Sequence, residues 1–471
     1  MEAGRIAYRN AQQGTKKHIL ILITNSFACI NIIHSGLAKK LASEYDVHLL
    51  STMIRSEQLL QVNSHFDLDL KLIDLDLPRE PTWITYLRRF EKILFAEHFD
   101  IVTQQIKYQR KGKWTQFWVK NLLWLISHKN AAKIMLKAIR RLIIFLTSFS
   151  IKLKTLLPYH FEGVISSSPL DPRENRIVNF CRKNRMKSLA IIISWDNMTS
   201  KGVINADHDY TLVWNNFMKN EFLQFYSIFN IAGPKVIATG IPRFDCYFQD
   251  RAEYQNAETR KGLDILPGNR VILIATSALR HFPNQLEIIL DVLHFAEVEG
   301  NVHVVVRCHP ADPFNAYNQL TDKKSVTIWH PKNLPKAGKD RFYTWFPELN
   351  FLDSLAETLR ICDVCIQFAS TMKLDAAACG KRVISIAYDG NMPLPHHKSV
   401  ARLYDYNHQI PLNALQLDEL VRSKEQLFIA LKNNLDHRGA NSELSSIKPF
   451  IHFTEAKSVD YTANVIAEWL D

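Results

Sequence analysis

The sequence is poor in cysteine, and the seven cysteines that it has form no pattern. They stand at positions 29, 181, 246, 308, 362, 365 and 379. Cys362 and Cys365 have CxxC spacing, but no second Cys or His pair stands where a zinc finger requires one. Residues 1–17 are polar and lack the apolar core of a secretory signal. We therefore expect reduced thiols in a cytoplasmic protein, with no zinc or redox site.

Acidic residues are absent from one long segment, 101–161, which contains twelve Lys and Arg residues. The whole chain has a formal net charge of +11, so the remainder is nearly neutral. The segment also contains three Trp residues and the apolar run LIIFL at 142–146. Its longest charge-free apolar stretch, between Arg141 and Lys152, has about ten residues, whereas a membrane-spanning helix needs about twenty.

This composition has three interpretations. Trp, Phe and Leu beside Lys and Arg are typical of a helix that lies on an anionic membrane surface. The segment is also compatible with two ordinary helices whose basic faces are solvated, or with nucleic-acid binding. Aliphatic residues outnumber polar readers of bases, and no known nucleic-acid-binding motif is present. We therefore predict a protein that is peripheral on the inner face of the cytoplasmic membrane, with no nucleic-acid partner.

Internal repeats and low-complexity tracts are also absent, and 471 residues are enough for two domains. Short apolar runs alternate with helical stretches, which indicates an α/β protein with parallel sheets. Helices are expected at 31–43, 284–298, 351–362 and 372–379. Strands are expected at 18–24, 47–50, 163–166, 188–194, 210–214, 234–239, 271–276, 302–307, 326–329, 364–368 and 383–386.

The polar stretch 249–269 reads as a linker between two Rossmann-like halves. We predict an N-terminal acceptor domain over 1–248, with the basic segment 101–161 as a membrane-associating insert. The C-terminal domain, over 249–471, is predicted to bind a nucleotide-activated donor. In open parallel sheets, ligands bind beyond the carboxyl ends of the strands, so the residues that follow each apolar run are the candidates for a site.

Two such places lie in the second half. His309 follows the run VHVVVR, and Pro310 fixes the turn that holds the imidazole at the edge of the sheet. Ser370 and Thr371 follow VCIQF and open a helix, whose first N–H groups and dipole favour an anion. Asp375 stands about one turn into that helix, where it is a candidate acceptor for ribose hydroxyls. Each has a plain structural alternative: a turn, an N-cap and an exposed acid.

The first half has a polar loop at 194–202, directly after the run SLAIIIS. Polar loops on a rigid scaffold are common places for functional sites. In this loop Asp196 is a candidate general base and Lys201 a candidate phosphate ligand. His34, after the first strand, is a second candidate base, although the residues slightly favour a histidine on a helix face. Arg243, after the bend at Gly240, is a cation that we expect near the cleft between the halves.

The stretches VIATGIPRFD, RCHP and STMKLDAAACGKRVISI resemble the C-terminal half of bacterial GT-B proteins for surface carbohydrates. The resemblance covers about 190–390. It is greatest to glycosyltransferases and CDP-glycerol glycerophosphotransferase-like proteins, and the UDP-N-acetylglucosamine 2-epimerases are similar in the same places. It implies that His309, Ser370 and Thr371 hold the donor's phosphates and that Asp375 holds the ribose. Those families more often have Gly after the Ser and Glu in the helix, where this sequence has Thr371 and Asp375. The resemblance therefore does not identify the nucleotide.

The resemblance implies a GT-B glycosyltransferase-type enzyme for surface polysaccharide or lipopolysaccharide synthesis. Its partners would be a nucleotide-activated donor, a lipid-linked or surface-glycan acceptor and an anionic membrane surface. Two alternatives stay open: a sugar-nucleotide epimerase, and a non-catalytic surface-binding protein. Asp74 and Asp76 have the spacing of a metal-binding DxD motif but lie in an alternating strand pattern. In a GT-B protein, cations and helix dipoles stabilise the leaving diphosphate, so we expect no metal and no cofactor besides the donor.

Overall fold

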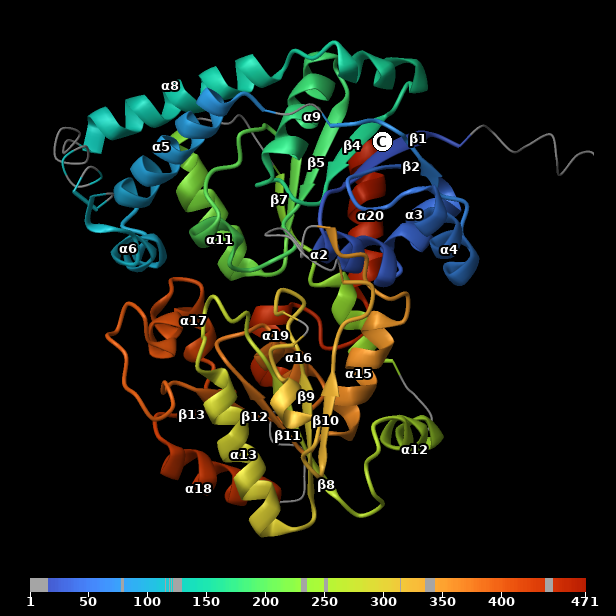
Figure 1. The fold of residues 1–471 in the computed structure, drawn as a ribbon. Coiled ribbons are helices and arrows are strands. Elements are labelled where there is room, and N and C mark those ends of the chain that lie inside the picture. The colour runs from blue at the N-terminus through green and yellow to red at the C-terminus, as the bar shows by residue number, and fades with distance from the viewer. Residues whose placement is uncertain are drawn as a thin grey trace, which may run out of the picture.

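Two parallel β-sheets form the framework of the protein, one in each half of the chain (Figure 1). The computed structural model describes residues 16–77, 80–114, 116–117, 119, 121, 129–229, 235–249, 253–313, 315–334, 344–436 and 444–471. Trp118 and Trp124 of the basic segment, like parts of the predicted loop 329–347, lie outside these residues. None of the helices within the described ranges is long and apolar enough to cross a membrane.

The first sheet has seven parallel strands in the order β3-β2-β1-β4-β5-β6-β7. The strands are β1 (His18–Ile23), β2 (Asp46–Ser51), β3 (Lys71–Leu72), β4 (Gly163–Ser166), β5 (Lys187–Ile191), β6 (Tyr210–Val213) and β7 (Lys235–Ala238). β1 is buried along almost its whole length, which explains why its sequence is a continuous apolar run rather than an alternating one. The predicted strands of this half are confirmed within a few residues at each end.

The second sheet has six parallel strands in the order β10-β9-β8-β11-β12-β13. They are β8 (Arg270–Ala275), β9 (Val302–Arg307), β10 (Val326–Trp329), β11 (Val364–Gln367), β12 (Arg382–Ile386) and β13 (Glu419–Val421). Counted from its own first strand, each sheet has the core order 3-2-1-4-5-6 of a doubly wound Rossmann fold, and the first sheet adds one strand at its far edge. The predicted α/β class with two Rossmann-like sheets is confirmed.

Helices cover the sheets and connect their strands. In the first half they are α2 (Ser26–Cys29), η1 (Ile30–His34), α3 (Leu37–Glu44), α4 (Ser56–Phe66), α5 (Thr82–His98), α6 (Val102–Gln109), α8 (Lys129–Thr147), η2 (Lys152–Tyr159), α9 (Pro172–Lys183), α10 (Asn197–Ser200), α11 (Asn216–Tyr226), η3 (Ser227–Phe229) and η4 (Pro242–Tyr247). The basic segment contributes α8, which runs along the outer side of this half and contacts α5 and α9 (Figure 1).

In the second half the helices are α12 (Glu253–Gly262), α13 (Gln285–Glu299), η5 (Asn318–Leu320), α15 (Phe351–Ile361), α16 (Met372–Ala378), η6 (Val400–Asp405), α17 (Gln409–Asn413), α18 (Lys424–Asp436), α19 (Leu444–Ile451) and α20 (Ser458–Leu470). The final helix, α20, returns to the first half and packs against α3 and η4 (Figure 1). Trp469 of α20 lies directly over Gly163 of β4, where a Cβ atom would clash with its ring. The division at 248/249 remains a prediction.

Two sequence predictions differ from the structure. The helix predicted over 31–43 is split into α2, the π-helical turn η1 and α3, because Gly36 adopts a left-handed backbone with φ 88° between η1 and α3. The predicted linker 249–269 contains the helix α12, which contacts α15. Its polar composition reflects a helix that exposes much of its surface, and composition alone cannot tell such a helix from a linker.

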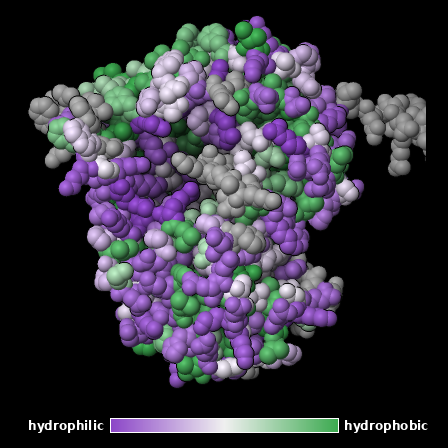
Figure 2. All heavy atoms as spheres, in the orientation of Figure 1, coloured by the Kyte–Doolittle hydropathy of each residue, from purple (hydrophilic) through white to green (hydrophobic). Residues whose placement is uncertain are grey.

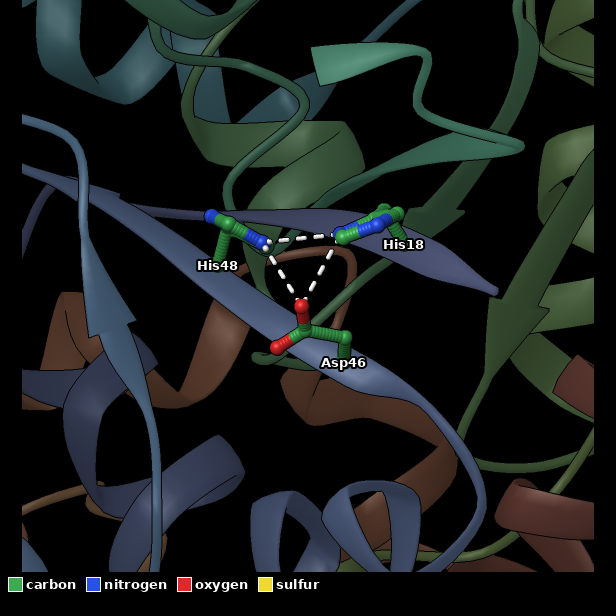
Figure 3. A group of neighbouring side chains, drawn as sticks. All are labelled: His18, Asp46 and His48. Carbon is green, nitrogen blue, oxygen red and sulfur yellow. Dashed lines mark hydrogen bonds and ion pairs between the residues drawn. The ribbon is translucent and has the colours of Figure 1, made fainter. Parts of the chain in front are cut away.

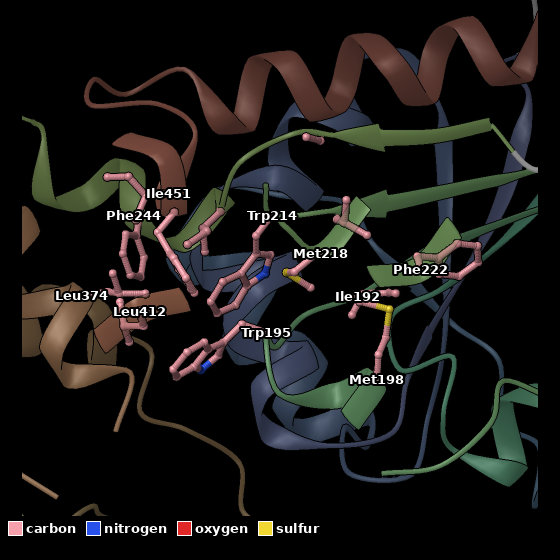
Figure 4. Packing of buried hydrophobic residues seen from close by; sticks show 14 of the residues in the cluster. Ile192, Trp195, Met198, Trp214, Met218, Phe222, Phe244, Leu374, Leu412 and Ile451 are labelled. Carbon is pink, nitrogen blue, oxygen red and sulfur yellow. The ribbon is translucent and has the colours of Figure 1, made fainter. Parts of the chain in front are cut away.

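The hydrophobic core is continuous between the two halves. One cluster of buried side chains joins Trp195 and Trp214 of the first half to Leu374 and Leu412 of the second (Figure 4). Trp195 makes edge-to-face contacts with His408, at 5.1 Å between ring centroids, and with Phe450, at 5.3 Å. Trp195 is therefore a packing residue between the halves, and it fixes the loop 194–202 at their junction.

Candidate functional site

A cleft of about 1050 Å³ opens where the two halves meet. Most of its lining comes from the first half, from loops that follow β1, β4 and β5 and from one face of α5. The second half contributes His281, His309 and Thr344. The strands of a parallel sheet end on one side, so both sheets present their carboxyl edges to this space, as expected for a ligand site in this fold. Hydrophilic residues are prominent at this level of the molecular surface (Figure 2).

The wall of the cleft is positively charged. Among the described residues that line it, six are Arg or Lys and four are Asp or Glu. Arg88 forms an ion pair with Glu80 at 2.9 Å, and Arg173 with Asp171 at 2.6 Å, so two of the four acids are already neutralised. The net positive charge that remains favours an anionic ligand.

Three lysines converge on the C-terminal end of α10. Lys92 of α5 and Lys107 of α6 both donate to the carbonyl oxygen of Ser200, at 3.2 Å and 3.4 Å, and Lys201 is the next residue. Burial, together with the neighbouring Lys107, Lys201 and Lys111, lowers the pKa of Lys92 to about 8. Such mutual repulsion is relieved when an anion binds, so this cluster is suited to a phosphate group.

Glu91, on α5 beside Lys92, is the carboxylate of the cleft whose pKa is close to neutral pH. Burial raises its pKa to about 7, against a hydrogen bond from Asn205 and the charges of Arg140 and Arg88. Its Oε2 accepts from Asn205 Nδ2 at 2.7 Å. Its Oε1 is buried and has no hydrogen-bond partner among the described residues. A carboxylate with this pKa and one oxygen uncommitted is a candidate general base for an acceptor that reaches this oxygen.

Asp196 lies in the cleft, as the sequence predicts, but its environment stabilises the charged form. Burial acts to raise its pKa, and this effect is outweighed by Lys201, His408 and hydrogen bonds from Ser194 and Ser200, so the pKa lies well below its usual range. The Ser194 and Ser200 hydroxyls donate to its two oxygens at 2.5 Å and 2.6 Å. A carboxylate held in this way is a weak proton acceptor and a good anchor for the loop.

His309 reaches the cleft from the carboxyl end of β9, as the sequence predicts. Its Nδ1 accepts a hydrogen bond from the backbone N–H of Ala311 at 3.0 Å, which leaves the proton of a neutral ring on Nε2. Burial and the nearby Arg280 lower its pKa to about 4, so the imidazole is neutral at physiological pH. His309 can therefore donate one hydrogen bond from Nε2 to a ligand oxygen.

Ser370 and Thr371 stand at the start of α16, as predicted, although they are not part of the cleft lining in this state. Thr371 makes no side-chain cap. The N–H of Ser370 donates to Gln367 Oε1 at 2.6 Å, and that of Met372 donates to Ser370 Oγ at 3.3 Å. Two of the N–H groups proposed for a donor phosphate are thus already satisfied internally, and the phosphate site at this helix stays a prediction.

Arg243 and Asp375 pair with each other, and neither lines the cleft. Both side chains are buried, and they form an ion pair of 2.5 Å between η4 and α16. Tyr247 also donates to Asp375, at 2.6 Å, and the carboxylate is buried and does not line the cleft. The charge of Arg243 is likewise paired with that of Asp375 and not with a phosphate. The pair was separated by 132 residues in the sequence, and no local pattern could have revealed it.

His34 does not reach the cleft. It lies on η1 with its ring against Phe66, at 5.7 Å between centroids, and both ring nitrogens are buried without a partner among the described residues. Burial and the nearby His65 lower its pKa to about 3. The interpretation that the sequence slightly favours, a side chain on a helix face, agrees with this placement, and His34 is not among the residues that line the cleft.

Sequence reasoning missed Glu91 and Lys92. Both lie on α5, in a stretch without a motif, and they reach the cleft because α5 packs against α8 and α6. The sequence signals only that this stretch is an amphipathic helix. Such a pattern shows which face of the helix is buried, but it does not show which residues lie opposite that face.

Residues 192–329 match the model of the family described as CDP-glycerol:poly(glycerophosphate) glycerophosphotransferase. The matched part runs from the end of β5 to β10 and so includes the loop 194–202, Arg243 and His309. It confirms the predicted resemblance. Among curated proteins, none matches this chain.

Solved structures share the fold. The UDP-N-acetylglucosamine 2-epimerase of Methanocaldococcus jannaschii, solved with UDP-GlcNAc and UDP, superposes with a TM-score of 0.54 at 12% identity, covering 96% of this chain and 99% of that one. The corresponding Neisseria meningitidis enzyme, bound to UDP-GlcNAc, gives 0.53 at 11% identity with coverage of 96% and 99%. At such identity the likeness concerns the fold alone, and it confirms the GT-B type of architecture.

Proposed function

We propose that this chain, which has a GT-B type of fold and a segment that matches the glycerophosphotransferase family model, transfers a glycosyl or glycerophosphate-type group from a nucleotide-activated donor to a surface-glycan or lipid-linked acceptor. The pathway would be that of bacterial surface polysaccharide or lipopolysaccharide. The observation that carries the proposal is the cationic cleft between the two carboxyl sheet edges, within which the family-matched segment contributes both Lys201 and His309.

The proposed reaction moves negative charge onto the departing phosphate of the donor. On the side of the second half, His309 Nε2–H donates to a phosphate oxygen of the donor. Lys92 and Lys201 face the same space from the first half. Groups that are fixed before the reaction stabilise such charge strongly, because no reorganisation is needed when it develops. These residues supply the charge stabilisation, so the proposed reaction needs no metal.

The acceptor hydroxyl must lose a proton as it attacks. Glu91 is the carboxylate that suits this role, since its pKa of about 7 lets it exist as a base near neutral pH and still hold the proton afterwards. Asp196, the first candidate from the sequence, would act instead as a positioning residue for Ser194, Ser200 and Lys201. The two assignments predict different dependences of kcat/KM on pH.

A thermal-shift series tests nucleotide binding directly. UDP, CDP, CMP, GDP and ADP are each added to the full chain, because a ligand that binds only the folded state stabilises it by RT ln(1 + [L]/Kd), about 2.7 kcal/mol at a hundredfold excess over Kd. We expect one nucleotide to raise Tm, and Lys201→Met to weaken its affinity about tenfold. Lys261→Met, an exposed lysine on α12, is the control. If no nucleotide shifts the wild-type Tm, the donor site is refuted.

The fold shared with 2-epimerases keeps a second candidate in view, a sugar-nucleotide epimerase. An epimerase converts its nucleotide sugar without any acceptor. Incubation with UDP-N-acetylglucosamine alone, followed by separation of the products, therefore distinguishes it from a transferase, which leaves the donor unchanged. Donor binding with no turnover, even when acceptor extracts are added, would instead support a non-catalytic surface-binding protein.

We further propose that α8 holds the enzyme at an anionic membrane surface. Large apolar side chains stand out on this helix, with Ile134 exposed by 69% and Phe145 by 61%, and the basic residues Lys133 and Arg141 are exposed beside them. Hydrophobic residues gather along the edge of the molecule over α8 (Figure 2). An amphipathic helix with aromatic, aliphatic and basic residues and no acids binds such surfaces.

Arg140, although it lies on α8, does not face the proposed membrane surface. Its guanidinium is buried, donates to the carbonyl oxygens of Ile204 and Ala206 at 2.9 Å each, and pairs with Asp207 at 2.7 Å. The charge count of the sequence could not separate this structural arginine from Arg141, its neighbour, which points to solvent.

A further inference from the structure

A cluster of two histidines and an aspartate lies at the edge of the first sheet that faces away from the cleft (Figure 3). His18 is the first residue of β1, and its register partner Asp46 is the first residue of β2. His48 follows two residues later on β2, so its side chain shares the face of Asp46. Three side chains are thus presented by two adjacent, hydrogen-bonded strands, which is a rigid support for a ligand site.

The three potential ligand atoms form a nearly equilateral triangle. The distances are 2.9 Å from His18 Nδ1 to Asp46 Oδ2, 3.2 Å from His18 Nδ1 to His48 Nε2, and 3.4 Å from His48 Nε2 to Asp46 Oδ2. A tetrahedral ion with bonds of about 2.0–2.1 Å separates its ligand atoms by about 3.3–3.4 Å. Movements of a few tenths of an ångström would therefore create the coordination geometry.

The atoms of this cluster are close enough to be joined by hydrogen bonds or by a bound cation. Asp46 Oδ2 is approached by three nitrogen groups, with Lys71 Nζ at 2.6 Å in addition to the two histidines. The two ring nitrogens are 3.2 Å apart, so without a metal one ring can donate to the other. With both rings neutral and their facing nitrogens unprotonated, a divalent ion would accept a lone pair from each of the three atoms.

The surroundings combine a fixed ring with an open side. The His48 ring makes edge-to-face contacts with Tyr159, at 5.4 Å, and with Phe161, at 5.2 Å, which hold its orientation. The side chain of His48 is 7% exposed, whereas that of His18 is 42% exposed. The open side provides a path for an ion and room for water as a fourth ligand, and contacts that orient a ligating ring typically strengthen metal binding.

We propose that His18, Asp46 and His48 bind one divalent transition-metal ion, with Zn²⁺ the closest match to a site of two imidazoles and one carboxylate. Imidazole nitrogens suit zinc, copper and nickel, and a carboxylate oxygen is compatible with zinc. The ion joins the amino ends of β1 and β2. β1 has six residues at about 3.3 Å each, so the ion lies about 17 Å from the cleft and takes no part in group transfer.

Lys71 competes with the ion. Its Nζ occupies the carboxylate oxygen that the ion requires, and its positive charge repels a cation. The Lys71 side chain is about half exposed, so it can swing into solvent when the ion binds. The chain without metal is thereby held together by the lysine, and the metal form exchanges that ion pair for coordination.

The test uses the full chain after treatment with a chelator and titrates it with ZnCl₂ by calorimetry, with no nucleotide present. We expect saturable binding of one Zn²⁺ per chain and a rise in Tm. His18→Ala and Asp46→Asn should each weaken the affinity at least tenfold. His396→Ala is the matched control, because His396 and Asp405 form a surface pair at 2.6 Å with no third ligand assigned.

A fourth variant protects the test against misfolding. Lys71→Met keeps all three ligands and removes the competitor, so it should bind Zn²⁺ severalfold more tightly than the wild type. The proposal is overturned if the wild type shows no saturable binding, which would leave a hydrogen-bonded cluster only. It is also overturned if binding is indifferent to the changes at His18, Asp46 and Lys71, since the ion would then lie elsewhere.

Discussion

The surroundings of two carboxylates in the cleft shift their pKa values in opposite directions. Glu91 is buried with one oxygen uncommitted, and its pKa is raised to about 7. Asp196 is also buried, but two hydroxyl donors and Lys201 keep its pKa low. Environments that push two carboxylates apart in pKa separate a proton acceptor from a group that stays charged.

This difference gives a pH prediction. A general base acts only when it is unprotonated, so with Glu91 as the base, kcat/KM should fall as the pH drops through about 7. Glu91→Gln should lower kcat by about 10²–10⁴-fold, because amides do not accept the proton. The measurement is a pH–rate profile of wild type, Glu91→Gln and Asp196→Asn. A profile that stays flat from pH 8 to 5, with activity lost in Asp196→Asn, would assign the base to Asp196.

The buried pair of Arg243 and Asp375 leads to a stability prediction. Arg243→Met leaves a buried carboxylate with only Tyr247 as donor, and breaking such a pair from one side costs about 3–5 kcal/mol. Urea unfolding should show this loss. The double variant Arg243→Met with Asp375→Leu should recover much of it, because both charges are then gone. If Arg243→Met instead unfolds like the wild type but loses nucleotide affinity, the phosphate contact first expected from the sequence would be right.

At the scale of elements, α8 has two faces with different tasks. Leu136, Ile139 and Ile143 are buried against the first half, and Arg140 ties the helix to the loop before β6. The opposite face carries the exposed apolar and basic residues. The helix can therefore bind a membrane without giving up the contacts that hold it on the protein.

This separation makes the membrane proposal testable without unfolding the protein. The wild type should sediment with phosphatidylglycerol vesicles far more than with phosphatidylcholine, and salt should partly reverse it. Each cation near an anionic surface contributes about 1 kcal/mol, so changing Lys133, Lys137 and Arg141 to Glu should weaken binding by more than tenfold.

The matched control reverses the same number of charges elsewhere: Lys261, Lys324 and Lys432, all exposed on the second half. It should sediment like the wild type, and neither variant should alter nucleotide binding. Equal loss in both variants would show that overall charge, and not α8, drives the association. A wild type that ignores anionic vesicles at low salt would refute the membrane proposal.

At the scale of the whole molecule, the cleft depends on contacts between chain segments that are far apart in the sequence. Thr103 of α6 and Asn407 of the second half exchange hydrogen bonds of 2.9 Å and 3.0 Å. The hydroxyl of Thr199 contacts His408 Nδ1 at 3.1 Å. α20 then returns from the second half to pack on the first. These contacts hold Glu91, Lys92 and His309 around one space.

Most strands of the two sheets, and the polar residues at their carboxyl edges, can be predicted from local sequence. Continuous apolar runs produce buried parallel strands, and the residues that follow such a run lie at the sheet edge, so local order alone placed Asp196, Lys201 and His309 at the lining of the cleft, while their roles remain proposals. The short edge strand β13 has no apolar run, with only Val421 buried, and was missed for that reason.

Which polar residues are available for chemistry depends on contacts that form only in the folded protein. Arg243 and Asp375 pair with each other, His34 packs against Phe66, and α5 brings Glu91, the proposed base, to the lining of the cleft. The physical reason is that burial, pairing and pKa depend on neighbours brought together across more than a hundred residues. A strand's apolar run is a local property, whereas the partner of a charge is not.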